Sequence, residues 1–190
     1  MKILQNVIRY IIKEGVPKEP SVMIALYPNA ETISNIVSYR DKIKKMHDLS
    51  SMSEILPENL HATVRWWDSR IGNYHKIAIQ LGTFKFDESI DAKITDVDVL
   101  GDSLSLMLDS VSMQRLFDKV DNLVLGYGGP PSTYPRYRPH IALFYGDWDN
   151  VIVDQVTEQP DFPIVFDRIK MTDNSENIYL NKRIENGPKV

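Results

Sequence analysis

The stretch "LHATVRWW" (60–67) decides the fold, because its polar and apolar side chains alternate as they do in a β-strand. Successive side chains of a strand point to opposite faces, so one face should carry the chemically active groups while the other packs. The predicted active face comprises His61, Thr63, Arg65 and Trp67. The predicted packed face comprises Ala62, Val64 and Trp66.

A second strand, "RPHIALFYG" (138–146), repeats this layout later in the chain. His140 enters the apolar run directly after a loop, as His61 does, and the alternation places Ala142 on the same face as His140. The opposite face is expected to carry Ile141, Leu143 and Tyr145. A lone strand histidine is most simply a structural residue, but a matched pair favours a shared chemical role.

The segments around the two motifs predict an α+β domain with a largely antiparallel sheet. Two segments carry apolar residues at helical spacing, 30–47 and 112–124. The expected further strands are 21–28, 75–84, 90–99 and 103–109, and a closing hairpin of 162–173 and 177–183.

Through these two strands the chain resembles the 2H phosphoesterases. The motif of that superfamily is a histidine, any residue, and then a threonine or serine, and it occurs twice, each time in an apolar strand. That superfamily includes RNA ligase-like cyclic phosphodiesterases and viral anti-CBASS nucleases. The resemblance covers residues 21–183 and implies a bilobal fold, with two largely antiparallel sheets around a central cleft and two main helices outside. Residues 21–190 are therefore expected to form one domain. Residues 1–20 are expected to be an N-terminal helical extension that contacts the body of the protein, a partner or a second copy.

The resemblance implies that His61 and His140 act as general acid and base on a phosphodiester. An imidazole with an ordinary pKa of about 6.5 can accept or donate a proton at neutral pH. It also implies that Thr63 binds a phosphate oxygen. The second motif departs from the pattern, because Ala142 stands where the family has a hydroxyl. Either another group replaces that hydroxyl or the activity is reduced.

Further candidates for substrate binding come from the first motif and from the loop 126–139. Arg65 could clamp phosphate with its guanidinium fork, and Trp67 could stack on a base. The loop interleaves aromatic and basic groups, which is typical of nucleotide contacts, although it could be a plain connector. Its candidates are Tyr134, Arg136, Tyr137 and Arg138. Both tryptophans could equally be core residues, and Trp148 is a weaker candidate for base contact.

Composition limits the ligands. The net charge of −4 provides no global basic field for long duplex nucleic acid, so an anionic ligand must meet a local cluster of positive charge. The 190 residues contain no cysteine, which fits a cytoplasmic location. No apolar run is long enough to span a membrane, no metal site is indicated, and no cofactor is expected.

The sequence therefore predicts a metal-independent phosphodiesterase acting on a small nucleotide. The substrate would be a cyclic oligonucleotide signal or an RNA end with a 2′,3′-cyclic phosphate. One alternative is a protein that sequesters a cyclic nucleotide with weakened catalysis, as Ala142 would suggest. Another is a scaffold that assembles through its N-terminal helix.

Overall fold

The computed structural model describes residues 21–47, 49, 52–68, 72–86, 90–132, 136–146, 148, 159–173 and 177–184. The predicted N-terminal helical extension (1–20) and the loop residue Tyr134 lie outside the described residues.

The predicted strands and helices occur in the predicted α+β order with one exception, and two short elements, β2 and η2, were not predicted. The strands are β1 (Ser21–Pro28), β2 (Ser53–Glu54), β3 (Ala62–Asp68), β4 (Ile90–Leu100), β5 (Ser103–Asp109), β6 (His140–Tyr145), β7 (Ile164–Asp173) and β8 (Ile178–Arg183). The helices are α2 (Ala30–His47), the short 3-10 helix η2 (Pro57–Asn59), α3 (Tyr74–Thr83) and α4 (Val111–Gly126).

The exception is α3, where the sequence predicted a strand over 75–84 and the prediction is wrong. Apolar residues in "KIAIQL" alternate as in a strand, but Ile77, Ala78 and Leu81 also lie on one helical face, and these are the residues that are buried. The side chain of Asn73 accepts a hydrogen bond from the backbone N–H of Lys76 and so caps the helix. Helical capping and packing therefore prevail over the alternation.

All the strand pairs are antiparallel, and β4 connects the two halves of the sheet. The order is β2-β6-β5-β4-β7-β1-β3, with β8 paired to β7. The first residues of β4, Ile90–Ala92, pair with β7, whereas the rest of the strand pairs with β5. This arrangement matches the predicted bilobal α+β fold.

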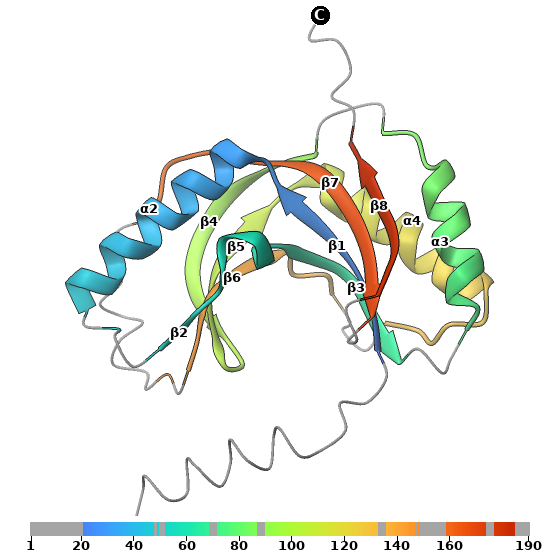
Figure 1. Ribbon diagram of the computed structural model, residues 1–190, viewed down its shortest axis with the longest axis horizontal. Helices are drawn as coiled ribbons and strands as arrows, with labels where there is room; N and C mark the ends of the chain where they lie inside the picture. The colour runs from blue at the N-terminus through green and yellow to red at the C-terminus, as the bar shows by residue number, and fades with distance from the viewer. Residues whose placement is uncertain are drawn as a thin grey trace, which may run out of the picture.

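The sheet curves into an arch, with α2 over one arm and α3 and α4 over the other (Figure 1). Its helix-facing side is apolar; in β1, for example, Val22, Ile24 and Leu26 are fully buried in the core. Curvature brings β3 into contact with β6, although the two strands lie near opposite ends of the strand order. No helix in the described ranges is long and apolar enough to cross a membrane.

Candidate active site

The two histidine motifs meet in one pocket. His61 and Thr63, at the start of β3, line it together with His140 and Ala142 of β6. The remaining lining residues are Ile55, Asn59, Ser103 and Tyr145. The pocket has a volume of about 70 Å³. Two imidazoles that are far apart along the chain therefore face the same small space.

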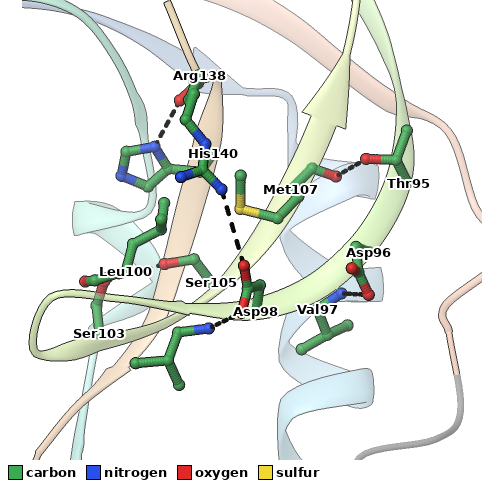
Figure 2. A network of polar contacts seen from close by, with 11 residues as sticks. Thr95, Asp96, Val97, Asp98, Leu100, Ser103, Ser105, Met107, Arg138 and His140 are labelled. Carbon is green, nitrogen blue, oxygen red and sulfur yellow. Dashed lines mark hydrogen bonds and ion pairs between the residues drawn. The ribbon is translucent and has the colours of Figure 1, made fainter. Parts of the chain in front are cut away.

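Each histidine is held by the same local hydrogen bond. Nδ1 of His61 lies 2.7 Å from the carbonyl oxygen of Asn59, and Nδ1 of His140 lies 2.8 Å from that of Arg138. Because a carbonyl oxygen only accepts, each Nδ1 must carry the proton. Each neutral ring then keeps a lone pair on Nε2, the atom left for a ligand. Figure 2 shows this contact for His140.

Burial lowers the pKa of His61 below its ordinary value, and the positive charges of His140 and Lys170 lower it further. The hydrogen bond to Asn59 acts in the opposite direction, because it favours the protonated ring. The Tyr27 ring lies 5.7 Å from the imidazole and contributes to the enclosure. His61 is therefore neutral near pH 7, with an unprotonated Nε2.

A bulge in β3 reverses the faces predicted for the second half of the strand. Thr63 pairs with Ala25 and Arg65 with Ile24, so Val64 is an extra residue without a partner on β1. Beyond the bulge, Trp66 shares the pocket side of the sheet with Thr63, while Arg65 and Trp67 turn to the core. The exposed fractions agree: 51% for Trp66 and 2% for Trp67. The predicted placement of Trp67 beside the histidines is wrong, because strict alternation ignores the bulge.

Arg65 is likewise not in the pocket, and its guanidinium is fully engaged elsewhere. Its Nε donates to Oδ1 of Asp121 at 2.8 Å, Nη1 donates to the carbonyl of Trp66 at 2.9 Å, and Nη2 donates to that of Pro130 at 2.6 Å. The side chain is 3% exposed. Arg65 thus fastens β3 to α4 and to the following loop, and the prediction that it lies on the catalytic face is wrong.

The loop candidates are placed differently from one another. The Tyr137 ring stacks on Phe117 at 4.6 Å, and its hydroxyl donates to the carbonyl of Thr63 at 3.2 Å. Tyr137 therefore supports β3 from outside the pocket rather than lining it, and burial raises its pKa. Arg138 is exposed, with Nη2 3.8 Å from Oδ2 of Asp98 (Figure 2). Arg136 is exposed and does not line the pocket.

Four lining residues of the pocket were missed by the sequence analysis: Ile55 and Asn59, which precede β3, and Tyr145 and Ser103, which lie on β6 and β5. A second bulge, at Leu143, turns Tyr145 to the pocket side of β6, although alternation placed it on the opposite face. Ser103 of β5 lies directly opposite Tyr145 in the sheet, and its neighbour Ser105 lies opposite Ala142. The alternating serines of "SLSLML" (103–108) indicate a polar face on β5. That this face adjoins the second motif follows only from the pairing of β5 with β6.

The serines form a hydroxyl pair beside the position where the motif lacks one. Their Oγ atoms lie 3.0 Å apart, and Ser103 Oγ also donates to the carbonyl of Leu100 at 3.0 Å (Figure 2). Ser105 is fully buried, whereas Ser103 lines the pocket. Among the described residues, no group of three or more histidine, aspartate or glutamate side chains is arranged to hold a metal ion.

Comparison with known proteins rests on structure alone. No family model and no curated protein sequence matches the chain. Apo LigT from E. coli is similar in structure, with a TM-score of 0.58 and 14% identity over 88% of this chain and 96% of LigT. TT0787 from Thermus thermophilus has a TM-score of 0.59 and 11% identity over 87% of this chain and 98% of its own.

A third similar structure, described as a phosphoesterase, has a TM-score of 0.59 and 15% identity, and the match covers 88% of this chain and 95% of that one. LigT, TT0787 and this third protein are members of the 2H phosphoesterase superfamily. At such identities the similarity establishes the fold. The fold predicted from the two histidine motifs is thereby confirmed: this chain has the fold of the 2H phosphoesterases.

Proposed function

We propose that the protein is a metal-independent phosphodiesterase in which His61 is the general base and His140 the general acid. The single observation that carries this proposal is the pair of identically held imidazoles lining one pocket. His61 receives the role of base because its lowered pKa keeps Nε2 unprotonated. The charge of His140 also disfavours a proton on His61, which supports the assignment of His61 as the base.

The proposed reaction is an in-line displacement at phosphorus. Nε2 of His61 takes a proton from the attacking oxygen, which is a water or a ribose 2′-hydroxyl, as the new P–O bond forms. The bond to the leaving oxygen breaks, and that oxygen takes the proton from Nε2 of His140. Exchange with solvent then restores the starting protonation of both rings. General acid–base catalysis of this kind contributes a factor of about 10² to 10⁴ in rate.

Two hydroxyls are proposed to hold the non-bridging phosphate oxygens. Thr63 supplies one, as the family motif implies. Ser103 supplies the other in place of Ala142, because it lines the same pocket from the adjacent strand. The Ser103 hydroxyl, which donates a hydrogen bond to the carbonyl of Leu100, would turn to donate to a phosphate oxygen, while Ser105 continues to donate to Ser103 Oγ.

The substrate is proposed to be a nucleotide, with Trp66 and Tyr145 as base contacts. Each is the fifth residue after its histidine, each lies just beyond a bulge, and both share the pocket side of the sheet. They are 51% and 45% exposed, respectively. Stacking on such a ring is worth about 1–3 kcal/mol per base. The structurally similar LigT has been crystallised with 3′-AMP and with ATP, which is consistent with a nucleotide ligand.

Two substrates are proposed for this site: a cyclic oligonucleotide, and an RNA end bearing a 2′,3′-cyclic phosphate. The second candidate function is sequestration of a cyclic nucleotide without turnover. It is favoured only by Ala142, the position at which the motif lacks its hydroxyl.

The test is turnover in EDTA of cyclic dinucleotides, cyclic trinucleotides and 2′,3′-cyclic mononucleotides. His61→Ala and His140→Ala should each lower the rate by at least about 100-fold. His47→Ala is the matched control, because His47 lies in the last turn of α2 and does not line the pocket. Binding without turnover would indicate the sequestering protein. Turnover that disappears in EDTA, or that survives both variants, would contradict the mechanism.

A further inference from the structure

Three cations share the pocket side of the sheet, and one of them, Lys170, lies close to His61. Arg168 and Lys170 belong to β7, and Arg183 belongs to β8. Paired residues of antiparallel strands point to the same face. Lys170 pairs with Ala25, the partner of Thr63, so it shares the side of the sheet on which Thr63 lines the pocket.

Arg168 continues this surface away from the pocket. It pairs with Tyr27 on one side and with Arg183 on the other. Tyr27 is the link to the histidines, because its ring lies 5.7 Å from the His61 ring and Lys170 Nζ lies 3.9 Å from its centroid. The three cations therefore form one basic patch, defined as Arg168, Lys170 and Arg183, that begins at the pocket and extends across β7 to β8.

Among the residues that the structure describes, the basic patch has no acidic partner. Within the described ranges, no carboxylate forms an ion pair with any of its members, whereas Arg40 pairs with Glu54 and Arg65 with Asp121. Like charges directly opposite each other on neighbouring strands are destabilising, and Arg168 and Arg183 stand in that relation. In addition, burial and the charge of Arg168 lower the pKa of Lys170. A bound anion would relieve this repulsion.

The patch is also unexpected in a chain with a net charge of −4. Scattered surface lysines and arginines would require no explanation. Three cations that share one face, adjoin the two-histidine pocket and repel one another do require one. Phosphate groups are the anions that arginine and lysine bind with charge-assisted hydrogen bonds.

We propose that Arg168, Lys170 and Arg183 form a second phosphate-binding site, which holds a phosphate group one nucleotide away from the scissile phosphate. This inference rests on the proposed function, because it takes the two-histidine pocket as the position of the scissile group. The substrate is then an oligonucleotide with at least two phosphates, cyclic or linear, and a 2′,3′-cyclic mononucleotide fills only half of the site.

The first test measures binding by calorimetry in a His61→Asn background, so that ligands are not consumed. Three probes are compared: cyclic dinucleotides, linear dinucleotides with a 5′-phosphate, and 2′,3′-cyclic mononucleotides. The two-phosphate probes should bind at least about 10-fold more tightly, since exchanging water for a charge-assisted contact is commonly worth a factor of this size. The double variant Arg168→Gln/Arg183→Gln should remove that advantage and leave mononucleotide binding unchanged.

The control is Arg115→Gln, which removes an exposed arginine from α4 and should change neither affinity. Thermal unfolding distinguishes a binding role from a structural one: loss of the Arg168–Arg183 repulsion should leave the melting temperature unchanged or raise it. An unaltered preference for two-phosphate probes in the double variant, or the absence of such a preference in the parent, would overturn the proposal.

Failure of this inference is distinguishable from failure of the proposed function. Turnover of mononucleotides without any advantage for two phosphates would refute the second site and leave the phosphodiesterase intact. Patch-dependent binding of dinucleotides without turnover of any probe would support the second site and refute catalysis. Cyclic and linear dinucleotides are compared separately, so the source of the second phosphate is resolved in the same experiment.

Discussion

Replacing Arg65 with methionine should destabilise the protein while leaving its chemistry intact. Methionine keeps much of the buried aliphatic volume but removes the donors to Asp121, Trp66 and Pro130. Breaking a buried ion pair by removing one partner costs about 3–5 kcal/mol. Asp121 is 23% exposed, so water solvates part of the charge left behind, and the expected loss is near the lower end, about 3 kcal/mol. For a domain of this size, that corresponds to a fall of about 6–12 °C in melting temperature.

The assay is urea unfolding followed by tryptophan fluorescence, with kcat/KM measured well below the unfolding transition. Arg115→Met is the matched control, because Arg115 is exposed on α4 and its loss should change the free energy of unfolding by no more than about 0.5 kcal/mol. In Arg65→Met, kcat/KM should change by less than about threefold, because the side chain does not reach the pocket. Normal stability combined with a large loss of kcat/KM would refute this reasoning and restore Arg65 as a phosphate ligand.

Three further predictions concern the pocket itself. Ser103→Ala should lower kcat by about 10-fold to 100-fold, because a hydrogen bond to the charged phosphate is lost. Adding Ala142→Thr to this variant should restore part of the lost rate. An unchanged kcat in Ser103→Ala would exclude Ser103 as the missing phosphate ligand. Trp66→Ala should raise KM for nucleotides with little change in the free energy of unfolding, whereas Trp67→Ala should lower that free energy by about 3–5 kcal/mol. Loss of stability in Trp66→Ala and a raised KM in Trp67→Ala would mean that β3 has no bulge at Val64. The acidic limb of kcat/KM against pH should have its midpoint below about 6.5, because the pKa of the base His61 is lowered. Lys170→Gln should move this midpoint to higher pH, because it removes a nearby positive charge. A shift to lower pH in Lys170→Gln would contradict the assignment of His61 as the base.

The sequence predicted those parts of the fold that depend on local pattern. Both motif strands lie where expected, and the match between His61 and His140 was sufficient to infer that the rings converge, because repeated chemistry implies a shared site. Contacts made across strands were not predictable in the same way. Ser105 can be placed beside Ala142 only once β5 is known to pair with β6, and nothing local to "SLSLML" indicates that pairing. The error over 75–84 has a different cause, since "KIAIQL" satisfies both periodicities and only packing decides between them.

The two bulges explain why strict alternation failed at the same point in both motifs. In each strand the extra residue follows the third position of the motif: Val64 after Thr63, and Leu143 after Ala142. A bulge shifts side chains by one place, so the residue that alternation assigns to the core turns to the pocket instead. This shift places Trp66 and Tyr145 on the pocket side. It also sends their preceding neighbours inward, where Phe144 packs in the core and Arg65 binds Asp121. One backbone irregularity, used twice, therefore separates the residues that can contact a ligand from those that hold each histidine-bearing strand in place.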